Sequence, residues 1–141
     1  MSEIINPQDA ELEEIILGSC LIESKAITLI ADILRPEAFY NEKNLEIYAT
    51  LQSMYRNGQK IDIITVKEEL ARRGKLEFIG GPYTLAHISG RVASSAHLEY
   101  HARILKQKYI RRETILGFHK LLALAADETT DIDDTLACLL Y

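Results

Sequence analysis

Apolar residues recur every three or four positions along most of this chain, which is the spacing of amphipathic helices and not of strands. The first helical stretch begins at about Pro7, because Asn6 can cap a helix and proline is well tolerated at the first helical position. Further stretches are predicted over about residues 25–34, 42–56, 63–73, 83–89 and 96–126, and a last one starts at Asp131 or Asp133. The pattern therefore predicts an all-α protein.

The segment from Ile61 to Val66 could pass for a strand. We favour a helix start there, because with Asp62 as the N-cap the apolar Ile61 and Val66 fall at the spacing of a hydrophobic staple. Gly74 then stands where a residue in the left-handed conformation commonly ends a helix.

The stretch over about residues 96–126 would form a rod of roughly 46 Å at about 1.5 Å per residue, too long to be covered by the chain before it. It carries two apolar stripes, one of Leu98, Ala102, Leu105, Tyr109, Leu116 and Ala123 and one of Ile104, Ile115, Phe118, Leu122 and Ala125. We therefore expect a compact bundle of short helices over residues 1–93, followed by a long helical hairpin over residues 94–141.

The second arm of this hairpin is expected to be truncated, because its predicted helix reaches Tyr141 after little more than two turns. Its apolar side consists of Leu136, Leu139 and Leu140. Natural chains rarely stop within a helix whose apolar face is unused. We therefore expect an excised piece of a longer protein, with a naturally short protein as the alternative.

The composition is that of a soluble globular domain, with 141 residues, 48% apolar residues and a net charge of −5. No apolar run approaches the roughly 18–20 residues of a membrane span, and the N-terminus has no secretory signal. Two distant cysteines, Cys20 and Cys138, suit a reducing cytosol, so we expect a cytoplasmic protein without membrane contact. The net negative charge argues against nucleic-acid binding as the main role of the protein.

Motifs for catalysis are missing from the sequence. None of the seven glycines begins a P-loop, and no GxGxxG or GxSxG occurs. Cys20 lies on an apolar helix face and is interpreted as a small core residue. The carboxylate pairs Glu13–Glu14 and Glu68–Glu69 are expected on solvated helix surfaces. We predict no catalytic and no cofactor-binding residue.

Two histidines, His97 and His101, stand at the i, i+4 spacing at which imidazoles can share a zinc ion. No clear third ligand accompanies them, so we favour two solvated polar residues and predict no metal site. Basic residues cluster at 72–75 and 106–112, but the second group spreads around its helix. A solvated face is favoured there over direct DNA binding.

Short motifs along the chain follow the order and spacing of a known family. They are Asn6–Glu13 leading into Ile16–Gly18, then Phe39–Tyr40, Gly58–Val66, Ile79–Leu85, Ser94–His97 and Tyr100–Leu105. Over nearly its whole length the chain resembles the N-terminal domain of DnaB-type replicative DNA helicases. Each motif alone is weak, and their order carries the resemblance.

This resemblance implies a collar domain on a hexameric helicase ring. In the family the hairpins pair between subunits, and the collar is a platform that docks a DnaG-type primase at the replication fork. The ATPase motor, which uses ATP and Mg and handles DNA, lies beyond a linker in a C-terminal domain. The chain would therefore be no enzyme by itself, have no cofactor, and meet DNA only through the intact ATP-dependent helicase.

Surplus apolar surface on the long helix usually marks a protein interface. On the resemblance, we expect Leu105, Tyr109, Arg112 and Leu116 to contact the hairpin of another subunit. Packing of these residues against the chain's own second arm is the alternative. A second hypothesis places Tyr83, after the Gly80–Gly81 turn, near the primase-binding surface.

Two other interpretations of the chain are open from the sequence. The helicase-binding C-terminal domain of primases has a similar helical fold, although the Gly80–Tyr83 turn and the opening motif favour the helicase. A free-standing helical DNA-binding regulator is the other, and the net charge of −5 counts against it.

Overall fold

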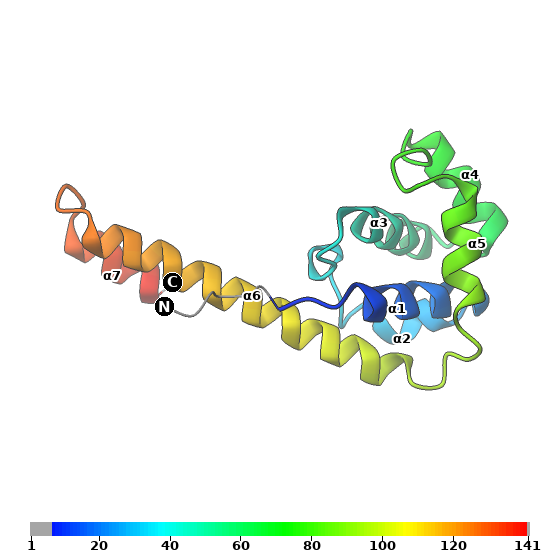
Figure 1. Ribbon diagram of the computed structural model, residues 1–141, viewed down its shortest axis with the longest axis horizontal. Coiled ribbons are helices and arrows are strands. Elements are labelled where there is room, and N and C mark those ends of the chain that lie inside the picture. Colours follow the sequence, from blue (N-terminus) through cyan, green and yellow to red (C-terminus); the bar gives the residue numbers. More distant parts are fainter. Residues whose placement is uncertain (1–6, 141) are drawn as a thin grey trace. The chain divides into compact units, whose positions relative to one another are not determined.

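The computed structural model describes the backbone of residues 7–140 and the side chains of residues 7–137. These residues form helices and connecting turns, without a strand (Figure 1). The elements are α1 (Ala10–Ile22), α2 (Ala26–Ile30), the 3-10 turn η1 (Pro36–Ala38), α3 (Glu42–Arg56), α4 (Ile63–Arg72), α5 (Pro82–Gly90), α6 (Leu98–Ala126) and α7 (Ile132–Leu140). The predicted all-helical fold, ending in a long helical hairpin, is confirmed.

Helix α1 begins three residues later than the sequence suggested. Its N-cap is Asp9, whose carboxylate accepts a hydrogen bond from the backbone N–H of Leu12 at 3.0 Å. Aspartate is a strong capping residue, because its side chain satisfies an amide that has no partner within the helix. The predicted cap, Asn6, lies outside the described residues, and Pro7 precedes the helix.

Helix α4 begins as predicted, and the strand alternative for its first residues is wrong. The carboxylate of Asp62 accepts from the N–H of Thr65 at 2.9 Å, and the Thr65 hydroxyl accepts from the N–H of Asp62 at 2.9 Å. Ile61 and Val66 on either side of this cap are both buried. Gly74 follows the helix with a φ of 70°, so local chemistry determines both of its ends.

The chain consists of two compact units. One unit, which we call the head, extends from Gln8 to Tyr109, and the other contains Pro7 and the chain from Ile110 onward. The division differs from the predicted one at residue 93, because Leu98, Ala102 and Leu105 are buried in the core of the head. The first turns of α6 therefore belong to the head.

The head is built around α1, which packs against α5, α3 and α2. Helices α1 and α5 approach closely at Gly18, where a Cβ atom would lie 2.6 Å from the carbonyl oxygen of Ile88. Phe39 and Tyr48 stack in the core with ring centroids 4.6 Å apart. Cys20 is also buried, as predicted, and burial raises the pKa of its thiol to about 12.

In each of the two carboxylate pairs predicted on the surface, Glu13–Glu14 and Glu68–Glu69, one side chain is buried instead. Glu13 is wholly buried, and Glu69 is largely buried, whereas Glu68 is exposed and Glu14 is half-buried. Each buried carboxylate has polar partners, since an anion out of water is costly without them. The guanidinium groups of Arg72 and Arg73 donate to Glu69 and lower the pKa of its carboxyl to about 2.

In the second unit, α7 lies alongside the last turns of α6 and runs in the opposite direction (Figure 1). The Asp127 carboxylate accepts hydrogen bonds from the N–H of Thr129 at 2.9 Å and from its hydroxyl at 2.6 Å, and these bonds lower the Asp127 pKa. Asp131 is the residue that starts α7, because its carboxylate accepts from the N–H of Asp133 at 2.8 Å. No described helix is long and apolar enough to cross a membrane.

Candidate protein interface

The helical hairpin leaves a row of large apolar side chains in water. Phe118 and Leu122 of α6 and Ile132 and Leu136 of α7 are between 50% and 68% exposed. Together with Leu121, Ala125 and Thr135 they line a groove of about 500 Å³ between the two helices. We call Phe118, Leu122, Ile132 and Leu136 the hairpin groove. Exposed apolar patches of this kind mark surfaces that other proteins cover.

A second hollow of about 230 Å³ extends this surface along α6. It is lined by Ile115, Phe118, His119 and Leu122, two of which also belong to the hairpin groove. The apolar surface therefore follows α6 from Ile115 to Ala125, or about three turns, a length over which one helix can lie along another.

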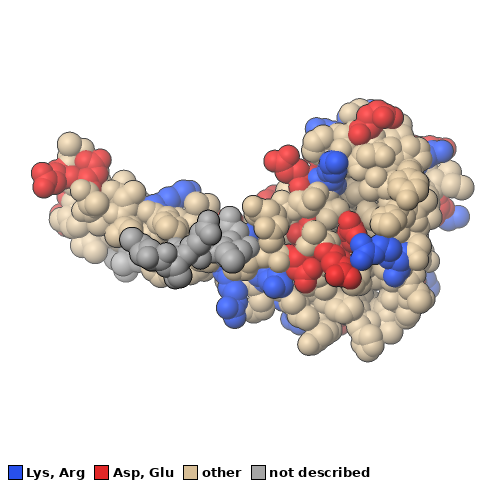
Figure 2. All heavy atoms as spheres, in the orientation of Figure 1, with Lys and Arg blue, Asp and Glu red and all other residues tan. Residues whose placement is uncertain are grey.

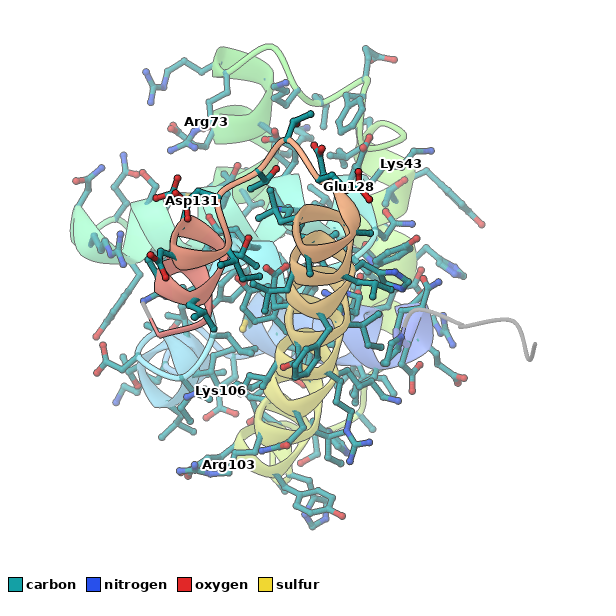
Figure 3. All side chains as sticks on the ribbon, turned by 90° about the vertical axis from the view of Figure 1, so that its left-hand side faces the viewer. Lys43, Arg73, Arg103, Lys106, Glu128 and Asp131 are labelled. Atoms are coloured by element: carbon teal, nitrogen blue, oxygen red, sulfur yellow. The ribbon has the colours of Figure 1, made fainter. Side chains whose placement is uncertain are left out.

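Acidic residues surround the turn at the end of the hairpin. Figure 2 shows Asp and Glu side chains gathered there, and Figure 3 shows Glu128 and Asp131 on the two sides of the turn. The exposed members are Asp127, Glu128, Asp131, Asp133 and Asp134. These carboxylates border the apolar surface with hydrated charge, an arrangement common at the rims of protein interfaces.

The four interface residues predicted on α6 do not form one surface. Leu105 is wholly buried in the head, so it is not available to a partner, and Tyr109 is partly buried against the same core. Arg112 donates a hydrogen bond to the carbonyl oxygen of Pro7 at 2.8 Å. Leu116 is half-exposed, but it lies about 200° around the helix from Phe118, away from the hairpin groove.

The groove residues of α6 were visible in the sequence as its second apolar stripe, whereas Ile132 of α7 was not singled out. Phe118, Leu122 and Ala125 follow each other at i, i+4 and i+7, and Ile115 begins the run. The periodicity of α6 alone could not choose between its two stripes. The choice depends on which stripe the head covers, and the head covers the first through Leu98, Ala102 and Leu105.

Tyr83 is a second exposed residue that the sequence singled out. It stands in the first turn of α5, is 76% exposed, and stacks on His87 with ring centroids 5.9 Å apart. The turn before it needs glycine, since Gly80 and Gly81 have φ values of 106° and 80°. Tyr83 thus follows a glycine turn with most of its ring exposed.

The polar residues that the sequence singled out contact one another or a carboxylate. The rings of His97 and His101 lie edge to face at 6.4 Å, and no group of three potential metal ligands occurs among the described residues. In the first basic cluster, Arg72 and Arg73 are bound to Glu69, which neutralises part of their charge.

The described residues form an all-helical fold with an exposed apolar groove on its helical hairpin. The family model described as the DnaB-like helicase N terminal domain matches residues 5–107. The chain therefore belongs to this family, and the match favours the helicase over the primase domain and the free-standing regulator.

Relatives in sequence are replicative DNA helicases. The replicative DNA helicase DnaB of Rhodothermus marinus is 43% identical over 108 residues, which cover 77% of this chain and 12% of that protein. The replicative DNA helicase DnaC of Bacillus subtilis (strain 168) is 34% identical over 119 residues, covering 82% of this chain and 26% of the relative. The chain thus spans about a quarter or less of the length of these relatives.

Two solved structures share the fold. The N-terminal domain of the DnaB helicase from Mycobacterium tuberculosis superposes with a TM-score of 0.88 at 29% identity, covering 96% of this chain and 99% of that one. A DnaB-like replicative helicase, whose structure was described with its interactions with primase, superposes with a TM-score of 0.78 at 27% identity. That match covers 94% of this chain and 31% of the helicase.

Proposed function

We propose that this chain is the collar domain of a replicative helicase and that two copies pair through their hairpin grooves. The observation that carries the proposal is the exposed apolar groove between α6 and α7. Pairing would place the four groove residues of one copy against those of the other. Such an interface is isologous, because the same patch serves on both copies.

The size of the apolar surface supports pairing. Full burial of a Leu, Ile or Phe side chain contributes about 1.5–3 kcal/mol relative to exposure. Each copy brings four half-exposed side chains to the contact. The free energy gained by burying them therefore exceeds the lower estimates of the cost of association, which are about 4 kcal/mol. Pairing would also withdraw the groove from contact with other proteins.

Two variants on opposite sides of α6 test this pairing. Leu122→Glu places a charge in the groove, whereas Leu116→Glu makes the same change on the other side of the helix. In sedimentation velocity we expect Leu122→Glu to lose the dimer that pairs through the hairpin groove, and Leu116→Glu to retain it. Circular dichroism should show wild-type helicity for both. The reverse result would rule out the groove and favour the first stripe of α6.

Docking of primase on the head is the second part of the proposed function. It is supported by the similar helicase structure described with its interactions with primase and by the exposed Tyr83, which stacks on His87. Tyrosine is one of the residue types enriched among the energetic hot spots of interfaces. In the whole helicase, DNA unwinding with ATP and Mg would belong to a separate C-terminal domain.

Calorimetric titration with purified DnaG-type primase tests the position of this contact. We expect Tyr83→Ala to weaken binding at least about thirtyfold, which corresponds to the roughly 2 kcal/mol or more that defines an interface hot spot. Tyr100→Ala is the matched control, because Tyr100 is also a well-exposed tyrosine but lies on α6. Equal affinities of wild type and Tyr83→Ala would show that primase does not dock at Tyr83.

A further inference from the structure

A polar hollow of about 460 Å³ lies on the head between the end of α2, η1 and the last turns of α3. Four charged side chains line it, namely Asp32, Arg35, Glu37 and Arg56. None of these four side chains forms an ion pair or hydrogen bond with another described residue. Two cations and two anions are thus held near each other without being paired.

The floor of this hollow is fixed by a buried amide. Gln52 is 5% exposed, and its Nε2 donates to the carbonyl oxygens of Ala31 at 3.2 Å and Leu34 at 3.4 Å. The hydroxyl of Tyr48 donates to the same Leu34 carbonyl at 2.9 Å. The Oε1 atom of Gln52 accepts no hydrogen bond from a described residue, so the floor also offers an acceptor.

The mixed charges of the hollow exclude several kinds of ligand. Phosphate groups of nucleic acid would be repelled by Asp32 and Glu37, and a metal ion would be repelled by Arg35 and Arg56. An apolar ligand would find few apolar side chains there. The complementary ligand carries an acidic and a basic group side by side, as a helix surface does when Glu and Arg are four residues apart.

The chain presents such a pair on its own surface. Glu99 and Arg103 in the first turns of α6 form an ion pair at 3.0 Å. Among the ion pairs of the described residues, it is the one in which both side chains are more than half exposed. Figure 3 shows Arg103 pointing away from α6. An exposed pair contributes little to stability, so exchanging it for new partners is nearly free of cost.

We infer that the polar hollow of one copy receives the Glu99–Arg103 pair of a second copy. In this contact the Glu99 carboxylate lies against Arg35 and Arg56, and the Arg103 guanidinium lies against Asp32 and Glu37. Arginine and carboxylate groups bind most strongly when two parallel hydrogen bonds form. The contact joins different surfaces on the two copies, so it can continue from copy to copy, unlike an isologous pairing that ends at a dimer.

The test uses the full chain carrying Leu122→Glu, so that association through the hairpin groove does not obscure association of the heads. Sedimentation equilibrium over a range of concentrations gives the self-association constant. Arg56→Glu and Glu99→Arg are each expected to weaken it at least about tenfold, the effect of breaking a close charge pair. The two changes together exchange the charges and should restore association to near the starting value.

Lys43→Glu is the matched control, because it makes the same charge change at an exposed lysine of α3 outside the hollow. It should leave association unchanged, and thermal unfolding should confirm that every variant is folded. Failure of the double variant to recover association would overturn the inference. An absence of concentration-dependent association in the Leu122→Glu chain would overturn it too.

This inference does not depend on pairing through the hairpin groove. If Leu122→Glu leaves the wild-type dimer intact, the groove proposal fails, and the charge exchange between Arg56 and Glu99 is then measured in the unaltered chain. If Leu122→Glu loses the dimer, the proposed pairing through the hairpin groove is supported. If Arg56→Glu and Glu99→Arg then have no effect on association, the proposed contact at the polar hollow is wrong.

Discussion

The carboxylate of Glu13, wholly buried on α1, accepts a hydrogen bond of 2.7 Å from the backbone N–H of Tyr40 at the start of α3. The same carboxylate accepts from the N–H of Asn41 at 3.3 Å and from the side-chain amide of Asn44 at 3.1 Å. The free N–H groups and positive end of a helix stabilise a nearby anion. A charge carried by α1 thus fixes where α3 begins.

Removing this carboxylate should destabilise the head. Glu13→Ala leaves three donors without their acceptor, and we expect the free energy of unfolding to fall by roughly 3–5 kcal/mol, because each unsatisfied donor costs about 1–3 kcal/mol. Glu68→Ala, at an exposed position of α4, should change it by less than about 0.5 kcal/mol. Urea denaturation measures both, and equal effects would show that the buried carboxylate has no special role.

Glu69 should make stability depend on pH in acid. Its pKa is lowered from 4.5 to about 2 in the folded chain by Arg72 and Arg73. The stabilisation is therefore fully present above pH 4.5 and is lost as the pH falls toward 2, because the unfolded chain takes up a proton first. Glu69→Gln should remove this part of the pH dependence. Wild type and variant should differ most above pH 4.5 and converge toward pH 2, and parallel curves would contradict the assignment.

Two glycines in helices should respond to alanine in opposite directions. At Gly18 a Cβ atom would meet the Ile88 carbonyl oxygen and Val92 Cγ2 at 2.6 Å, so Gly18→Ala should destabilise the chain by about 1–3 kcal/mol. At Gly117 nothing lies within 4 Å, so Gly117→Ala should stabilise it by up to about 1 kcal/mol through helix propensity. Thermal unfolding gives the sign of both, and a stabilising Gly18→Ala would refute the close approach of α1 and α5.

Cys20 should be chemically inert while the chain is folded. Burial raises its pKa to about 12, so almost no thiolate exists near pH 8, and the sulfur is also covered by the core. In a Cys138→Ser variant, we expect no alkylation by iodoacetamide under native conditions and complete alkylation in denaturant. Mass spectrometry reads both, and rapid native alkylation would mean that the core of the head opens readily.

The sequence was most informative where neighbouring residues decide the structure. Asp62 caps α4 through residues at most three positions away, and Gly74 ends the same helix by its own backbone conformation. The start of α1 was predicted from Asn6 and Pro7, three residues too early. The structure chooses Asp9, whose side chain reaches the N–H of Leu12.

The sequence by itself determined the all-helical fold, the long final hairpin and the family, because helix periodicity, capping and motif spacing are properties of residues near each other in the chain. Only the tertiary structure decided that Leu105 is core while Phe118 and Leu122 are exposed, and that Glu13 is buried beneath Tyr40. Burial depends on which distant segment covers a face. Helix periodicity shows that a face is apolar, but it does not show what covers it.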